Sequence, residues 1–170
     1  MLSKSFESIK DARDEDIKKL REDYNALFVG PGHLQAPPWE SVYLSEERII
    51  FDEHTLSVRE FYKDWGVSTN RVNKEPDDHI GFQMEFMSIL SDKGIDAIEN
   101  NNLDKLEKVL TAQNEFLELH TLLWLDQFSK NVIDKSQTDF FKGLGLFLSE
   151  YIKMDKELLM DLISNLEDRT

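Results

Sequence analysis

Apolar residues recur every three or four positions along nearly the whole chain, and this period is that of an amphipathic α-helix. In the first such segment the apolar positions are Ile17, Leu20, Tyr24, Leu27 and Phe28. Asp14 is expected to cap the start of this helix, and the Gly-Pro-Gly triplet at residues 30–32 is expected to end it. The pattern therefore predicts a helix from about residue 14 to residue 29.

Six later segments show the same period, at residues 58–65, 76–92, 103–117, 122–128, 140–152 and 158–166. Gly66 is expected to end the first of these, and Pro76 is expected to start the next, because proline suits a first helical turn. No segment alternates convincingly with a period of two, and only residues 42–51 are ambiguous. The chain is therefore expected to be all-α, a single domain over residues 1–170 that forms a bundle of about six to eight helices.

Residues 29–43 interrupt the helical pattern with glycines and prolines, and we expect an ordered loop there. A stretch of this length without secondary structure is uncommon in a compact domain and is often functional. Trp39 and Tyr43 could form the wall of an apolar groove. The alternative is that they only pin the loop to the body of the protein.

A second unusual segment is the acidic turn Glu75-Pro76-Asp77-Asp78-His79. Carboxylates in a first helical turn favour the positive end of the helix dipole, so Asp77 and Asp78 could simply cap. The same carboxylates could instead receive guanidinium groups, which bind them through two parallel hydrogen bonds. His79 could orient a carboxylate or make the turn sensitive to pH near neutrality.

Composition narrows the classes of partner. The 34 acidic and 20 basic residues give a net charge of −14, which repels nucleic acid and anionic lipid and attracts a basic partner; solubility alone is the other explanation. The chain has no cysteine, so disulfides and thiolate metal sites are excluded. It shows no secretory signal and no apolar stretch of membrane-spanning length, and we expect a soluble cytoplasmic protein.

No pattern typical of catalysis stands out. The four histidines, His33, His54, His79 and His120, are never spaced as a helical metal pair, and no Gly-rich phosphate loop or Gly-x-Ser-x-Gly turn occurs. Two glycines at 143 and 145 lie within a helical pattern, where they favour close packing. We expect no catalytic residue, no metal site and no cofactor. A nucleotide-binding enzyme is the alternative from another class, without a phosphate-binding motif to support it.

The motifs together carry a family resemblance over about residues 20–152. The matching segments are residues 30–33 (GPGH), 37–43 (PPWESVY), 75–87 (EPDDHIGFQMEFM), and the pattern FLxxH at 116–120 followed by Trp124, Leu125 and Phe128. In this order they resemble the TorD/DmsD family of redox-enzyme maturation chaperones.

That resemblance implies an all-helical, non-catalytic chaperone that acts in the cytoplasm. Members of the family bind the twin-arginine leader of a molybdopterin oxidoreductase and hold the enzyme back from export until its cofactor is inserted; some also bind the enzyme body. The leader-binding positions carried over from the motifs are Trp39, Ser41, Tyr43, Pro76, Asp78 and His79, with Asp77 as a weaker addition.

The chain also departs from the family pattern. Only about a dozen residues precede the first expected helix, so the N-terminal helical segment of the family is expected to be short or trimmed here. Leu123 stands where relatives often have proline, so the helix there is expected to continue.

Within the family, the alternative is a nitrate-reductase assembly chaperone that acts on a leaderless cytoplasmic catalytic subunit. A monomer and a helix-exchanged homodimer are both compatible with the resemblance.

Overall fold

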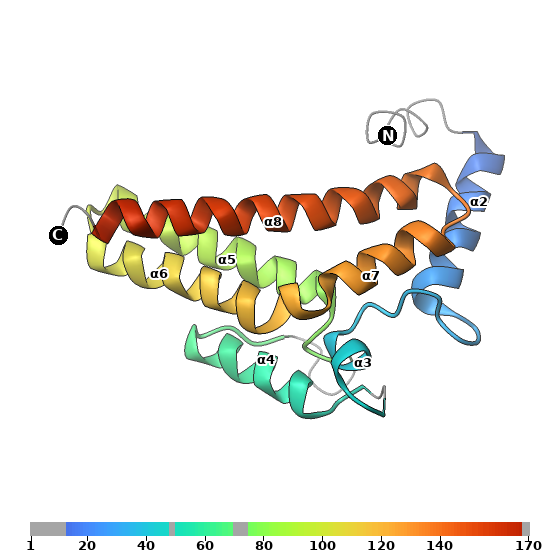
Figure 1. Cartoon of the computed structure of the whole chain (residues 1–170), viewed down its shortest axis with the longest axis horizontal. Helices are drawn as coiled ribbons and strands as arrows, with labels where there is room; N and C mark the ends of the chain where they lie inside the picture. Colours follow the sequence, from blue (N-terminus) through green and yellow to red (C-terminus); the bar gives the residue numbers. More distant parts are fainter. Residues whose placement is uncertain (1–12, 48–49, 70–74, 168–170) are drawn as a thin grey trace. The chain divides into compact units, whose positions relative to one another are not determined.

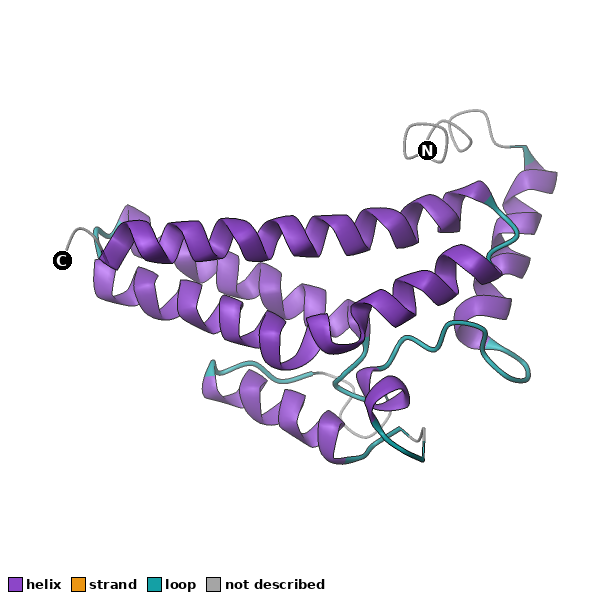
Figure 2. Ribbon diagram, viewed as in Figure 1, coloured by secondary structure: helices purple, strands orange, loops and turns teal. Residues whose placement is uncertain are grey.

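The computed structural model of the chain describes residues 13–47, 50–69 and 75–167, and its regular structure is helical (Figures 1 and 2). The α-helices are α2 (Asp14–Tyr24), α3 (Glu40–Leu44), α4 (Glu53–Asp64), α5 (Ile80–Glu99), α6 (Leu103–Phe116), α7 (Leu122–Lys135) and α8 (Asp139–Glu167). Short π-helical segments follow α2 (Asn25–Val29) and α6 (Leu117–Thr121). Within the described ranges there is no β-strand, which confirms the predicted all-α fold.

The described residues form two compact units. The first contains residues 13–38 and 125–152, and the second contains the described parts of 39–124 and 153–167. Helices α7 and α8 contribute residues to both units, which are taken in turn below. The single domain expected from the sequence stays a prediction, and the expected short N-terminal segment lies outside the described residues.

In the first unit, a side chain from α2 holds the turn that precedes α8. The buried Asp23 carboxylate accepts hydrogen bonds from the backbone N–H groups of Gln137 (3.0 Å) and Thr138 (2.9 Å) and from the Thr138 hydroxyl (2.6 Å). Backbone N–H groups outside a helix or sheet need such acceptors when they are turned toward the protein. Gly145 permits the close packing predicted for it, because an added Cβ would lie 3.1 Å from the Val132 side chain.

In the second unit, α4, α5 and α6 surround an aromatic core. The rings of Tyr62 and Phe86 have centroids 4.6 Å apart, and Phe116 lies 4.9 Å from Phe86. This buried aromatic core is the platform on which the candidate site rests.

Several predicted helix ends are wrong, and each has a local reason. Arg13, not Asp14, is the N-cap of α2, and the Asp16 carboxylate reaches back to its N–H (3.1 Å). Helix α5 begins at Ile80, after Pro76, and continues through Gly94 to Glu99. The two C-terminal segments predicted separately form one helix, α8, because residues 152–158 contain neither glycine nor proline.

Other predicted ends are confirmed. Gly30 follows the first helical segment with φ of 101°, and Gly66 follows α4 with φ of 70°, a region that glycine adopts readily. Helix α6, the π-helical segment and α7 follow one another directly, so the helix continues through Leu123 as expected. Among the described residues, none of the helices combines the length and apolarity that crossing a bilayer requires.

Candidate functional site

In the second unit, the end of the Pro-Pro-Trp segment, from Trp39 on, lies against the acidic turn. Trp39 and His79 form an isolated antiparallel β-bridge, and the Glu40 N–H donates to the Asp78 carbonyl oxygen (3.3 Å). The structure therefore brings Trp39 and Glu40 against the acidic turn, which lies about 40 residues further along the sequence. Where the sequence predicted a loop to residue 43, the short helix α3 begins at Glu40.

Asp78 caps α3 from the acidic turn and is completely buried. Its Oδ2 accepts the N–H of Ser41 (2.7 Å), and its Oδ1 accepts the Thr55 hydroxyl at the start of α4 (3.0 Å). Asp78 is therefore a helix cap, which is one of the two roles considered for it from the sequence. The helix that it caps is α3, which is distant in sequence, and not the helix that follows it. Both carboxylate oxygens are already engaged by donors of the chain itself.

Asp77 is also buried, and it is paired with an arginine of the same chain. The Arg59 Nε–H donates to Asp77 Oδ2 (2.7 Å), and Arg59 Nη2 forms an ion pair with the same oxygen at 2.6 Å. The Thr69 hydroxyl donates to Oδ1 (2.7 Å), and the Tyr62 hydroxyl donates to the backbone carbonyl of Asp77 (3.2 Å). The Asp77 carboxylate thus does bind a guanidinium group, and that group belongs to Arg59 in α4 of the same chain.

A third buried carboxylate, Glu40, joins α3 to α5 and to the π-helical segment after α6. Its Oε2 accepts from the Gln83 amide (2.7 Å), and its Oε1 lies 3.0 Å from His120 Nδ1. The Thr121 hydroxyl donates to the Gln83 carbonyl oxygen (2.9 Å). We refer to Glu40, Thr55, Arg59, Asp77, Asp78, Gln83, His120 and Thr121 as the buried polar network. Because buried polar groups are stable only when paired, this network specifies one arrangement of the segments.

The partly exposed residues above the network are Trp39, Glu75 and His79, which we call the Trp39 surface. The Trp39 indole N–H donates to Glu75 Oε1 (2.9 Å), and the Trp39 and His79 ring centroids are 6.0 Å apart. Indole, imidazole and carboxylate are therefore presented side by side. Their positions follow from the bridge between Trp39 and His79 and from the buried carboxylates beneath it.

The remaining predicted site residues differ in their surroundings. Ser41 and Pro76 are buried, and among the described residues the Ser41 hydroxyl has no hydrogen-bond partner. The Tyr43 ring packs 5.3 Å from the Trp124 ring, which makes it a pin between α3 and α7. The structure therefore brings Trp39, Glu75 and His79 together at the surface, while Ser41 and Pro76 are buried and the half-buried Tyr43 packs against Trp124.

Sequence reasoning did not assign Arg59, Thr55 or Glu40 to the site. Glu40 and His120 lie within the motifs that carried the resemblance. Each is a polar residue beside apolar ones, and this pattern could have identified both as candidate site residues. Arg59 and Thr55 lie in an ordinary amphipathic helix, and their partners are 18 and 23 residues away in sequence. No local pattern indicates those pairings.

The Tyr62 hydroxyl keeps its proton. Burial raises the pKa of this hydroxyl well above 10. The pKa is raised further by the nearby carboxylates of Asp77, Glu40, Asp78 and Glu85. The phenol is therefore a permanent donor to the Asp77 carbonyl. Within the described residues there is no group of three or more His, Cys, Asp or Glu side chains that could hold a metal ion.

His79 ends the acidic turn as the N-cap of α5, since its Nδ1 accepts the Gly81 N–H (2.9 Å). Burial lowers the pKa of the imidazole, although Glu75 and Asp78 act in the opposite direction. Only the neutral ring can accept at Nδ1, so protonation removes the cap. The stabilisation is complete above the unfolded-state pKa of about 6.5 and is lost as the pH falls through the lower folded-state value.

We expect the variant His79→Asn to remove this pH dependence, because asparagine is a good N-cap that does not titrate. The midpoint of thermal unfolding should fall more steeply for the wild type than for His79→Asn between pH 7.5 and pH 5. The difference between the two midpoints, measured by circular dichroism at several pH values, gives the effect directly. A difference that stays constant over this range would show that His79 does not titrate as described.

In the part of the chain that is described, fold and site define an all-helical protein in which a buried polar network supports a mixed aromatic and acidic surface. The family model of the nitrate reductase delta subunit matches residues 2–130. The chain belongs to this family, and the relatives named below confirm the resemblance to the TorD/DmsD proteins.

Three relatives illustrate the similarity. The probable Tat proofreading chaperone DmsD of Haemophilus influenzae is 31% identical over 129 residues, which cover 76% of this chain and 56% of that protein. The Tat proofreading chaperone DmsD of Salmonella typhimurium is 28% identical over 128 residues, covering 75% and 56%. The chaperone protein TorD of Vibrio parahaemolyticus is 24% identical over 155 residues, covering 89% and 69%. The chain thus spans a little over half the length of the two DmsD relatives.

Proposed function

We propose that this chain is a maturation chaperone that binds the twin-arginine leader of a molybdopterin oxidoreductase in the cytoplasm, and that it is not an enzyme. The names of the relatives support a proofreading role on Tat substrates. The observation that carries the proposal is the Trp39 surface, where indole and carboxylate lie within hydrogen-bonding distance on a fixed base. Such a surface suits a guanidinium group, which can stack on an indole and pair with a carboxylate.

The roles of the predicted residues divide according to their exposure. Trp39, Glu75 and His79 are accessible to a peptide, whereas Asp77 and Asp78 are at most 1% exposed and are bonded to Arg59, Ser41 and Thr55. We therefore assign direct contact with a leader arginine to Trp39 and Glu75. Asp77, Asp78 and Ser41 then act by holding the segments that present those two side chains.

Charge supports the same assignment. The net charge of −14 attracts a basic peptide over a distance of about 10 Å at 0.1 M salt. Glu75 Oε1 accepts the indole N–H, and among the described residues its second oxygen accepts no hydrogen bond. That oxygen is the acceptor that the proposal gives to the guanidinium group.

The test is the affinity of the chain for a fluorescently labelled peptide that carries two adjacent arginines followed by apolar residues, measured by anisotropy. We expect Trp39→Leu to weaken binding roughly three- to thirtyfold, the range of a partly desolvated cation–π contact. Glu75→Gln should weaken it less, and its effect should shrink at high salt. A peptide with two lysines should bind more weakly, because the lysine ammonium lacks the planar face with which a guanidinium group stacks on an indole.

The matched control is Glu99→Gln, which removes the same charge from an exposed position at the far end of α5. It should leave the affinity unchanged. Equal affinities for the arginine and lysine peptides, or no binding of either, would contradict leader recognition. If the chain instead bound only a mature catalytic subunit without a leader, the nitrate-reductase type of assembly chaperone would be the correct assignment.

A further inference from the structure

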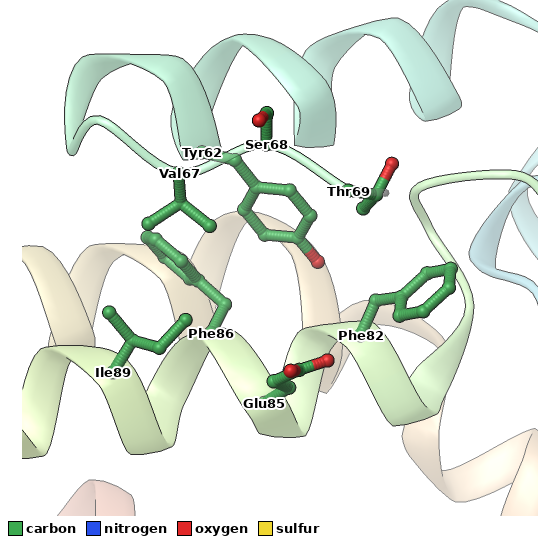
Figure 3. A pocket seen from close by; sticks show the side chains of 8 residues that line it. All are labelled: Tyr62, Val67, Ser68, Thr69, Phe82, Glu85, Phe86 and Ile89. Atoms are coloured by element: carbon green, nitrogen blue, oxygen red, sulfur yellow. The ribbon is translucent and has the colours of Figure 1, made fainter. Parts of the chain in front are cut away.

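A small cavity of about 210 Å³ opens between α5 and the segment that follows α4 (Figure 3). The residues that line it are Tyr62, Val67, Ser68, Thr69, Phe82, Glu85, Phe86 and Ile89. The polar groups among these side chains are the hydroxyls of Ser68, Thr69 and Tyr62 and the Glu85 carboxylate; the other four side chains are apolar. Figure 3 shows Tyr62, Val67, Ser68 and Thr69 on the side of α4 and the segment after it, and Phe82, Glu85, Phe86 and Ile89 on α5. None of these residues was assigned to the site by the sequence motifs.

The size of the cavity excludes large ligands. Sites for cofactors and drug-sized molecules measure roughly 300–1,000 Å³, so a nucleotide or a pterin does not fit. An apolar cavity of about 150 Å³ accommodates a benzene ring. A cavity of about 210 Å³ therefore matches one aromatic or branched aliphatic side chain.

The cavity adjoins the Trp39 surface through two independent contacts. Tyr62 and Thr69 line it and both donate hydrogen bonds to Asp77 in the acidic turn. Phe82, at its other end, has its ring centroid 5.7 Å from that of His79. Because an extended peptide advances about 3.3 Å per residue, we expect a peptide bound at the Trp39 surface to reach the cavity within a few residues.

Glu85 provides the charge at the rim of the cavity. It is exposed, and among the described residues its carboxylate makes no hydrogen bond or ion pair. It is also close enough to the Tyr62 hydroxyl to contribute to the raised pKa of that group. An apolar hollow with an unpaired carboxylate beside it complements a peptide in which an apolar residue stands next to a basic one.

We propose that this cavity is a second subsite for the leader, which takes one apolar side chain of the peptide while Glu85 pairs with a neighbouring basic side chain. The inference rests on the proposed function and adds the position and chemical class of a second contact. It predicts that the apolar residues near the arginines contribute to affinity through Val67 and Ile89, and not only through the aromatic residues of the Trp39 surface.

The experiment combines variants of the chain with variants of the arginine peptide. On the wild type, replacing the apolar residue that enters the cavity by alanine should weaken binding roughly tenfold or more, as expected when a large apolar side chain loses its burial. Val67→Phe fills the cavity, so it should weaken binding of the parent peptide and abolish the difference between the two peptides. Glu85→Gln should weaken binding about two- to fivefold, the range of an exposed ion pair.

Two control variants keep the test specific. Val29→Phe makes the same substitution at an exposed position outside the second unit, and Glu99→Gln removes the same charge from α5. Neither should change the affinity. If circular dichroism shows that Val67→Phe does not fold, Ile89→Trp fills the same cavity and is judged by the same comparison.

The outcomes separate this inference from the proposed function. If the wild type binds the arginine peptide but the cavity variants bind both peptides as the wild type does, the subsite is overturned while leader binding stands. If the wild type does not bind the arginine peptide at all, both are overturned. Loss of the difference between the peptides in the filled variant alone supports the subsite.

Discussion

The variant Asp77→Ala is expected to destabilise the folded chain by about 3–5 kcal/mol, the usual cost of removing one partner of a buried ion pair. The Asp77 side chain is 2% exposed and that of Arg59 only 20%, so solvent cannot replace the lost carboxylate. The Thr69 hydroxyl loses its acceptor as well. Urea unfolding at pH 7.5, followed by tryptophan fluorescence and circular dichroism, measures the loss.

A double variant identifies the cause. Asp77→Ala combined with Arg59→Leu removes both charges, and we expect it to recover much of the lost stability, because exchange of both partners for apolar groups is often close to neutral. A loss below about 1 kcal/mol in the single variant, or no recovery in the double variant, would mean that the pair is not buried as the structure shows.

The second large effect is expected for Asp78→Ala. This carboxylate is completely buried, and its removal leaves the Ser41 N–H and the Thr55 hydroxyl without acceptors. At roughly 1–3 kcal/mol for each unsatisfied buried donor, the free energy of unfolding should fall by about 2–5 kcal/mol. The same urea titration provides the measurement.

Asp78→Asn is the matched comparison, since it keeps the shape and one acceptor oxygen. We expect it to cost less than Asp78→Ala, because only one of the two donors loses its partner. Equal losses in both variants would show that the negative charge, and not the pairing of the donors, is what stabilises this turn.

These two effects change how leader binding should be tested. A substitution at Asp77 or Asp78 that weakens peptide binding would also weaken the fold, so the binding result alone would be ambiguous. Trp39, Glu75 and Glu85 are accessible, and their conservative variants leave the buried polar network intact. Binding data from these positions therefore report on recognition.

Much of the helical architecture was predictable because the period of apolar residues reports directly on a buried helix face. Gly30 and Gly66 marked helix ends correctly, since both adopt a backbone conformation that other residues disfavour. The start of α3 was mispredicted for a different reason. The acceptor that caps α3 is Asp78, 37 residues from Ser41, and no local pattern reveals it.

The candidate site shows the same division. The sequence indicated that the Pro-Pro-Trp segment and the acidic turn were both unusual, and it left open whether the aspartates cap a helix or receive arginines. The structure decides between these alternatives for each aspartate: Asp78 caps α3, and Asp77 pairs with Arg59 of the same chain. In the sequence, Glu75 and Glu85 cannot be distinguished from the other acidic residues. Only the structure shows that these two are accessible, whereas Glu40, Asp77 and Asp78 are buried.

By itself, the sequence determined the helical class of this protein, its acidic character and the two motifs that place it in its family. Those properties depend on residue type and on spacing within one or two helical turns. Only the tertiary structure decided which carboxylates are buried, which partners they have and where a cavity remains beside them. The physical reason is that desolvation and hydrogen bonding depend on neighbours brought together from distant segments, such as Glu40 and His120, which lie 80 residues apart in sequence and 3.0 Å apart in space.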